Sequence, residues 1–127
     1  MVLSKLIWTQ YFQKKMNELW DRVFGLINKK TTCGIYRITN TLNGKCYVGQ
    51  SVDIASRWKS HCKCGLGIDA PATNLLYNAM QEDGVWNFTF ELLEECPREQ
   101  LNEKEAFWIQ TYQSNNYGYN TQKGNKV

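Results

Sequence analysis

The sequence lacks any long, uninterrupted hydrophobic run. No stretch of the 127-residue chain approaches the roughly 18 consecutive apolar residues that a helix needs to cross a bilayer. Near the N-terminus the apolar residues follow Lys5 and are interrupted by Thr9, Gln10 and Gln13, a pattern that does not suit a secretory signal. We therefore expect a cytoplasmic protein of one domain, with no membrane partner.

An even, regularly spaced set of cysteines is also missing. A secreted disulfide scaffold is usually shorter than this chain and has an even number of cysteines. The segment 61–64, His-Cys-Lys-Cys, could begin a zinc site, but structural zinc sites have a second such pair, and the remaining cysteines stand alone. Reduced thiols without zinc are therefore expected at the five positions, Cys33, Cys46, Cys62, Cys64 and Cys96.

The chain has little excess charge, +3 in all, but this charge is unevenly distributed. Residues 1–33 contain six basic and two acidic side chains, whereas residues 34–127 contain nine basic and ten acidic ones. A polyanion would therefore be attracted mainly by the N-terminal segment and by local basic patches.

The N-terminal segment has the spacing of an amphipathic helix. Its large apolar residues recur at three- and four-residue steps between residues 4 and 28, and the polar residues 29–32 then form a linker. This pattern divides the chain into a helix at 1–30 and a domain at 31–127. The apolar face of the helix must cover its own domain or a second copy, so residues 1–30 could form a homo-oligomer.

Residues 34–49 predict a β-hairpin. The pair Asn43-Gly44 is preferred in two-residue type I′ turns, where both central residues need a positive φ. This turn would place Asn40 opposite Tyr47 in the ladder.

The hairpin brings two tyrosines to one face of the sheet. Because side chains alternate along a strand, Tyr36 and Tyr47 point to the same side. In the predicted register only the bare backbone of Gly49 lies diagonally beside Tyr36. We expect this opening to let a phosphate approach the sheet.

A charged helix follows the hairpin. Ser51 or Asp53 can cap it, and the helical pattern extends to about Lys63. Arg57 and His61 are four residues apart, so they are neighbours on the surface of this helix.

Glu105 departs from the expected pattern of a helix that packs on a core. An alternating segment at 88–92 predicts a third strand, and Pro97 begins a last helix. Glu105 lies on or beside the apolar stripe of this helix, four residues from both Leu101 and Ile109. Burying an unpaired carboxylate is costly, so the pattern leaves three partners open: a surface cation, a lysine or arginine in the interior, or a metal ion.

In their order and spacing these motifs resemble the GIY-YIG nuclease family, particularly the catalytic modules of phage intron-homing endonucleases. The resemblance rests on the triplets at 34–36 and 47–49, on Arg57 and on Glu105, and it extends over about residues 33–122. The second triplet has valine where the family usually has isoleucine, a mild departure that leaves the site intact.

The resemblance implies an α+β fold, with a small three-stranded antiparallel sheet flanked by helices and the N-terminal helix as an addition. It also implies an endonuclease that hydrolyses the phosphodiester bonds of DNA with one divalent cation, Mg²⁺ or Mn²⁺.

By position, the resemblance assigns a role to each motif residue. Tyr36 would take a proton from the attacking water with the help of His61, because a phenol is a poor base alone. Tyr47 would orient the water or the phosphate. Arg57 would neutralise charge on the phosphoryl oxygens, and Glu105 would hold the cation.

The resemblance implies one further catalytic residue, and four other positions are expected to contact the nucleic acid. Asn120 would position the phosphate or a tyrosine. The remaining expected contacts are Lys45, Gly49, Ser51 and Lys59.

Two alternatives remain open from the sequence. The chain could be a DNA-binding module that has the same fold without catalysis, or an interaction protein in which residues 1–30 associate. Glu105 argues against the first alternative, because simple DNA binding needs no buried carboxylate. The second is compatible with nuclease activity.

Overall fold

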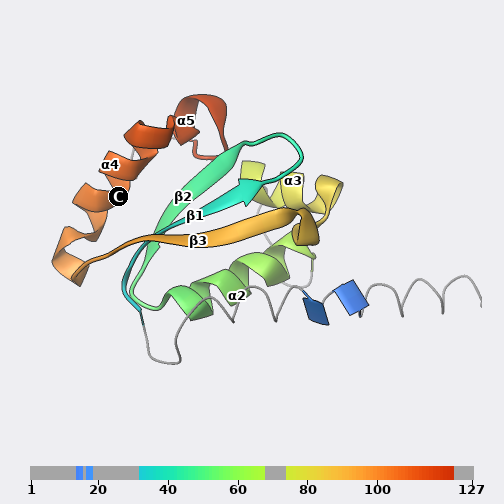
Figure 1. The fold of residues 1–127 in the computed structure, drawn as a ribbon, viewed down its shortest axis with the longest axis horizontal. Helices are drawn as coiled ribbons and strands as arrows, with labels where there is room; N and C mark the ends of the chain where they lie inside the picture. The colour runs from blue at the N-terminus through green and yellow to red at the C-terminus, as the bar shows by residue number, and fades with distance from the viewer. Residues whose placement is uncertain (1–13, 16, 19–31, 68–73, 122–127) are drawn as a thin grey trace, which may run out of the picture.

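A small antiparallel sheet forms the centre of the fold. The computed structural model describes residues 14–15, 17–18, 32–67 and 74–121. The strand order is β2-β1-β3, with β1 (Gly34–Asn40), β2 (Cys46–Ser51) and β3 (Phe88–Glu95). Helices flank this sheet, so the predicted α+β fold is confirmed (Figure 1).

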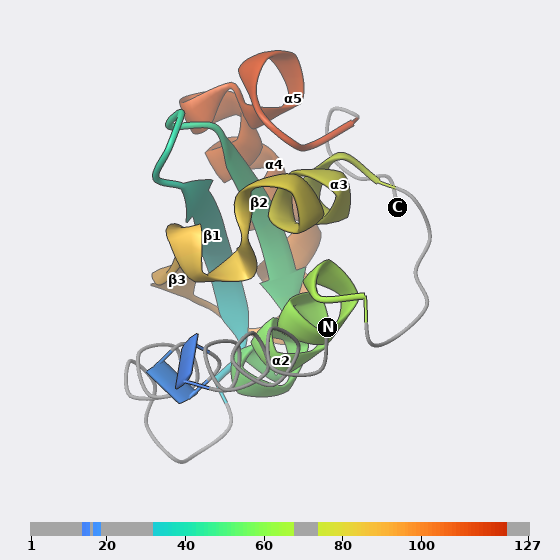
Figure 2. The same ribbon diagram turned by 90° about the vertical axis from the view of Figure 1, so that its right-hand side faces the viewer.

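The helices cover both faces of the sheet (Figures 1 and 2). Two of them, α2 (Ile54–Gly65) and α3 (Leu75–Asp83), lie on one face. On the other face lies α4 (Leu101–Tyr112), followed by the short α5 (Ser114–Tyr117). Short 3-10 turns precede β3 and α4, at Val85–Asn87 and Arg98–Gln100.

Each face of β1 packs against its own hydrophobic cluster. Tyr36 and Ile38 point toward α2 and are buried with Trp58. The intervening residue Ile35 points the other way and packs with Ile109 of α4. The alternation of side chains along a strand therefore determines which helix layer each residue contacts.

The loop between β1 and β2 is longer than the predicted two-residue turn. The backbone N–H of Asn40 donates to the carbonyl of Lys45 over 2.9 Å, which leaves residues 41–44 as the loop. Gly44 has a φ of 79°, but Asn43 does not share the positive φ that a type I′ turn requires of both residues. Instead, the side chain of Asn43 accepts a hydrogen bond from the N–H of Lys45 over 2.9 Å and stabilises the wider loop.

The wider loop shifts the hairpin register by two residues. Tyr36 lies opposite Gly49 rather than opposite Ser51, and Tyr47 lies opposite Ile38 rather than opposite Asn40. A shift by an even number of residues leaves every side chain on its original face. The predicted placement of Tyr36 and Tyr47 on one face therefore holds.

Side-chain caps determine where α2 and α3 begin. The carboxylate of Asp53, one of the two caps that the sequence allowed, accepts a hydrogen bond from the N–H of Ser56. The side chain of Asn74 likewise accepts from the N–H of Tyr77 over 2.8 Å. These caps position His61 on α2 and Tyr77 on α3.

The predicted N-terminal helix lies mostly outside the described residues. Residues 14–15 and 17–18 are helical, in agreement with the pattern. The division into 1–30 and 31–127 stays a prediction. Within the described parts of the chain, no helix is long and apolar enough to cross a membrane.

Candidate active site

Tyr36 lies at the centre of the candidate site and is fully buried. Its hydroxyl is 2.7 Å from Nε2 of His61, and its ring meets that of Trp58 edge-on. Burial and then the neighbouring Tyr47 raise the pKa of Tyr36 well above its ordinary value, against the opposing effect of Arg57. Tyr36 is therefore protonated at neutral pH, and it can act as a base only if its own proton has an acceptor.

His61 is a suitable acceptor. Burial, reinforced by the charge of Arg57, lowers the pKa of His61 to about 3, so the imidazole is neutral near pH 7. Its second nitrogen, Nδ1, lies 2.7 Å from the hydroxyl of Tyr77 on α3. Both ring nitrogens therefore have a tyrosine partner.

Tyr47 and Arg57 lie beside this buried pair. The ring of Tyr47 is centred 6.4 Å from that of Tyr36 and 5.6 Å from that of His61. Burial raises the pKa of Tyr47, and the charge of Arg57 opposes this rise. Tyr47 is half-buried and Arg57 is exposed, so they form the solvent-facing part of the group.

Glu105 is buried on the sheet side of α4, with 6% of its surface exposed. Its Oε1 accepts a hydrogen bond of 2.8 Å from Nε2 of Gln50 on β2. The same amide donates to Oδ1 of Asn102 over 2.8 Å. Glu105 also lies close enough to Tyr47 for its charge to act on that hydroxyl. Gln50 thus fixes the orientation of a carboxylate whose charge acts on Tyr47.

Gly49 does not provide the predicted opening for a phosphate. Gly49 is buried, and a Cβ at this position would collide with the hydroxyl and ring of Tyr36. The shifted register is the reason, since it places the two residues directly opposite each other. The absence of a side chain at Gly49 therefore makes room for the tyrosine ring.

Asn120 bonds to the backbone of β2. Its Oδ1 accepts from the N–H of Val48 over 2.9 Å, and its Nδ2 donates to the carbonyl of Val48 over 3.0 Å. Val48 lies between Tyr47 and Gly49 on a strand at the edge of the sheet. A role for Asn120 in positioning Tyr47 stays a prediction, and this contact supports it.

The other predicted DNA contacts lie on the surface or at its margin. Lys45 and Lys59 are exposed, in the hairpin and on α2. Ser51 is half-buried, and its Oγ accepts a hydrogen bond from the N–H of Asp53 over 2.9 Å. Contact of these three residues with a nucleic acid stays a prediction.

Sequence reasoning missed Gln50 and Tyr77. Gln50 directly follows the second motif triplet, and strand alternation alone would have pointed it away from Tyr47 toward the face that α4 covers. Tyr77 has no comparable signal, because it lies on the apolar face of a short helix, where a tyrosine is usually a core residue.

A comparison with known protein families identifies the family to which a chain with these residues belongs. The sequence model of the GIY-YIG catalytic domain matches residues 32–120, which include Tyr36, Tyr47, Arg57 and Glu105. The chain belongs to the GIY-YIG family.

A curated GIY-YIG relative is similar to this chain over its central part. Intron-associated endonuclease 1 of Enterobacteria phage T4 is 40% identical over 89 residues, which make up 68% of this chain and 36% of the relative. The chain therefore spans about a third of the length of that relative.

Two solved GIY-YIG structures have the same fold. A variant of the catalytic domain of the intron endonuclease I-TevI is 33% identical, with a TM-score of 0.64 over 76% of this chain and 99% of the solved one. A second structure, of the catalytic domain of homing endonuclease I-TevI, is 35% identical, with a TM-score of 0.61 over 71% and 98% of the two chains. The chain is therefore a catalytic domain of an endonuclease family, whose members generally use a divalent metal.

Proposed function

We propose that this domain hydrolyses phosphodiester bonds of DNA with one divalent cation, Mg²⁺ or Mn²⁺. One observation carries the proposal: the hydroxyl of buried Tyr36 lies 2.7 Å from Nε2 of a histidine that burial keeps neutral. A neutral imidazole accepts protons, so Tyr36 can receive a proton from water while it passes its own to His61. A lone tyrosine with a raised pKa could not do this.

Tyr47 and Arg57 supply the groups that face the substrate in this proposal. The planar guanidinium of Arg57 can donate to two phosphoryl oxygens and offset the charge that develops on them. Tyr47, on which the charges of both Arg57 and Glu105 act, orients the attacking water or the phosphate through its hydroxyl. The relatives are an intron-associated endonuclease and a homing endonuclease, which supports DNA as the substrate, and exposed Lys45 and Lys59 suit contacts with its backbone.

The residues present fit a cation that has one protein carboxylate. Among the described residues, no three His, Cys, Asp or Glu side chains gather as a metal site. Mg²⁺ needs no such cluster, because it keeps several waters and binds through one or two carboxylates plus phosphate oxygens. Glu105, oriented by Gln50, would hold it, and the bound cation would stabilise charge on the departing oxygen.

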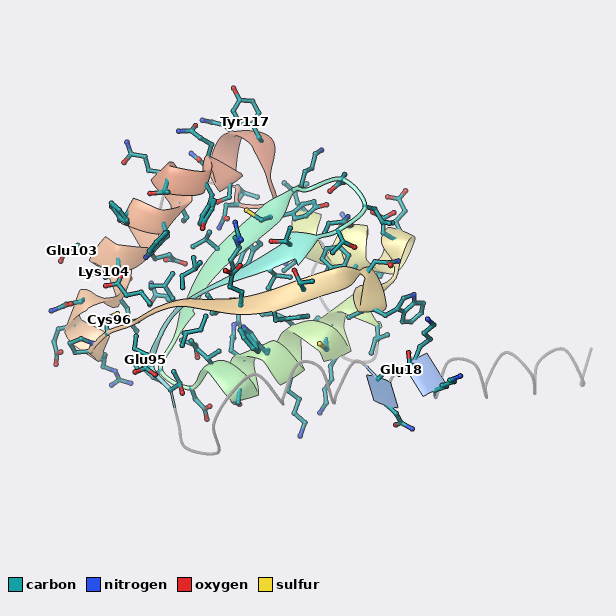
Figure 3. The ribbon with its side chains drawn as sticks, in the orientation of Figure 1. Glu18, Glu95, Cys96, Glu103, Lys104 and Tyr117 are labelled. Atoms are coloured by element: carbon teal, nitrogen blue, oxygen red, sulfur yellow. The ribbon has the colours of Figure 1, made fainter. Side chains whose placement is uncertain are left out.

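Plasmid nicking tests the proposal. Supercoiled DNA should be nicked in Mg²⁺ and left intact in EDTA. Glu105→Gln removes the charge but retains the shape, so we expect a loss of at least about 10²-fold in rate. Glu103→Gln is the matched control, because Glu103 is exposed on the outer side of the same helix (Figure 3).

Each negative result has a separate meaning. A folded wild-type chain that binds DNA but nicks none of it in either metal would support a catalytically silent module. Wild-type rates in Glu105→Gln would instead overturn the metal-ligand assignment alone.

A further inference from the structure

The hydrogen bond between His61 and Tyr77 extends the site beyond the family motif. Nδ1 of His61 and the hydroxyl of Tyr77 are 2.7 Å apart, as close as the hydroxyl of Tyr36 is to Nε2 on the other side of the ring. Tyr77 is 8% exposed and belongs to the same cluster as Tyr36. Three residues from β1, α2 and α3 thus form one buried chain of hydrogen bonds.

The direction of these hydrogen bonds decides whether His61 can help Tyr36. A neutral imidazole has a hydrogen on one nitrogen and a lone pair on the other. Nε2 can accept the proton of Tyr36 only if the hydrogen is on Nδ1. A buried N–H without an acceptor is costly, so this tautomer needs an acceptor at Nδ1. The Tyr77 oxygen is the partner that the structure places there.

We propose that Tyr77 is a positioning residue of the nuclease site, whose hydroxyl oxygen accepts the Nδ1 hydrogen of His61 and so keeps Nε2 open to the proton of Tyr36. This inference rests on the proposed function and deepens it. Tyr77 touches neither substrate nor cation, and it acts only through His61.

The same geometry gives the proton a route out of the buried site. The attacking water gives a proton to the Tyr36 oxygen, and the Tyr36 hydrogen passes to Nε2 of His61. The Nδ1 hydrogen then passes to the Tyr77 oxygen, and the original Tyr77 hydrogen passes to solvent, to which 8% of the Tyr77 surface is exposed. One proton enters from the water and one leaves from Tyr77, so the charge on His61 is unchanged. The hydrogen of His61 has moved from Nδ1 to Nε2, and the reverse transfer must restore it before the next turnover.

The groups around His61 disfavour a positively charged imidazolium. A proton that reaches the ring is therefore passed on to Tyr77. Arg57, on the same helix, opposes a second positive charge, and burial acts in the same direction. Among the residues that the structure describes, the remaining titratable neighbours are neutral tyrosines on three elements, Tyr36 on β1, Tyr47 on β2 and Tyr77 on α3, together with Cys64 beside Tyr77. None of them offers His61 a carboxylate that would hold it as a cation.

Nitrogen NMR tests the tautomer without any activity measurement. His61 is the only histidine of the chain, so the two imidazole ¹⁵N signals need no assignment by mutation. We expect the full-length protein at pH 7 to show the hydrogen on Nδ1. In Tyr77→Phe, which keeps the ring and removes the hydroxyl, we expect a substantial population with the hydrogen on Nε2. An Nε2–H tautomer in the wild-type protein would overturn the proposal, even if the variant failed to fold.

Cleavage kinetics provide the second readout. In Tyr77→Phe we expect a fall in kcat of roughly 10- to 100-fold at pH 7, with an unchanged KM for plasmid DNA. The wild-type advantage should shrink as the pH rises from 6.5 to 9, because the variant must rely on Tyr36 that has already ionised. Tyr117→Phe, at a position that is 74% exposed and points away from the sheet, should match the wild type throughout (Figure 3).

The outcomes distinguish the positioning role of Tyr77 from the proposed nuclease function. An unchanged kcat and pH profile in a folded Tyr77→Phe would overturn the positioning role while leaving the nuclease assignment intact. A wild-type protein that cuts no DNA would refute the proposed function, whereas the NMR result would still report on the tautomer.

Discussion

At the scale of single residues, the candidate site contains a histidine whose lowered pKa keeps it neutral between two tyrosines. His61 is 1% exposed, and its folded-state pKa is about 3 against an ordinary value of 6.5. Between these values the unfolded chain binds a proton that the folded chain does not. Stability from this group is therefore complete above pH 6.5 and is lost as the pH falls toward 3.

This difference predicts an acid-sensitive fold. Between pH 7 and pH 5, His61 alone should lower the free energy of unfolding by about 2 kcal/mol. Urea denaturation of the wild type and of His61→Gln at several pH values measures it. Over this window the variant should lose less stability than the wild type, whatever its stability at pH 7. Parallel curves for the two proteins would show that His61 gains its proton in the folded state as readily as in the unfolded one.

Arg57 should tolerate no replacement by another cation. Its guanidinium lies close enough to Tyr36 and Tyr47 for its charge to lower the pKa of both hydroxyls, and the proposed role needs its planar fork as well as its charge. We expect Arg57→Lys to lower single-turnover rates about as far as Arg57→Ala does, by roughly 10²- to 10³-fold. The matched control is Lys63→Ala, which removes a cation from the last turn of the same helix and is not among the predicted DNA contacts. A lysine variant with most of the wild-type rate would reduce the role of Arg57 to charge alone.

At the scale of the elements, the side-chain amide of Gln50 connects β2 to α4 through hydrogen bonds. Nε2 of Gln50 donates to both Asn102 and Glu105, each over 2.8 Å. Gln50→Met is close in shape and cannot donate, so Glu105 should lose its fixed orientation while the fold remains. We expect the Mg²⁺ concentration for half-maximal nicking to rise roughly 10-fold or more.

A metal titration of nicking rates measures this effect. Gln110→Met, exposed on α4, makes the same chemical change away from Glu105 and should leave the titration unchanged. If Gln50→Met also matched the wild-type titration, the hydrogen bond to Glu105 would have no part in binding the cation.

The hairpin shows why the sequence predicted the faces of the sheet better than its register. Strand alternation depends only on parity, so Tyr36 and Tyr47 were placed on one side despite the wrong turn. The turn itself depends on Asn43, whose side chain bonds to the N–H of Lys45 and so stabilises a wider loop in place of the preferred one. Local pairs such as Asn43-Gly44 permit several turns, and the surrounding contacts select among them.

In the candidate site too, the sequence predicted what local patterns determine and missed what depends on tertiary packing. Tyr36, Tyr47, Arg57 and Glu105 were predicted because each belongs to a motif of fixed spacing. The partner of Glu105 was not predicted, since the amide of Gln50 reaches it across 55 residues of sequence. Contacts of this kind arise when α4 packs on the sheet, and no local pattern encodes them.

At the scale of the whole molecule, charge and chemistry occupy different parts of the chain. Residues 1–33 have a net charge of +4, while residues 34–127, which contain every motif residue, have a net charge of −1. A nuclease domain that is almost neutral gains little from long-range attraction to DNA. The N-terminal segment, most of which lies outside the described residues, should therefore supply much of the electrostatic affinity.

We expect a variant that lacks this charge to bind DNA with a weaker dependence on salt. The variant changes six residues to glutamine in the full-length chain: Lys5, Lys14, Lys15, Arg22, Lys29 and Lys30. Each phosphate contact that is lost should lower the slope of log K against log salt by about 0.9, because fewer counterions are released. The rate at saturating DNA should stay the same, since the chemistry depends on residues outside this segment.

The control exchanges lysine and arginine at the same six positions, which retains every charge and should retain the wild-type slope. If the glutamine variant also kept the wild-type slope, these side chains would face away from DNA, and the segment would serve packing or assembly instead. A lower slope accompanied by a lower rate at saturating DNA would mean that the segment also orients the DNA in the site. Affinities at four or more salt concentrations, paired with single-turnover rates, therefore separate attraction from alignment.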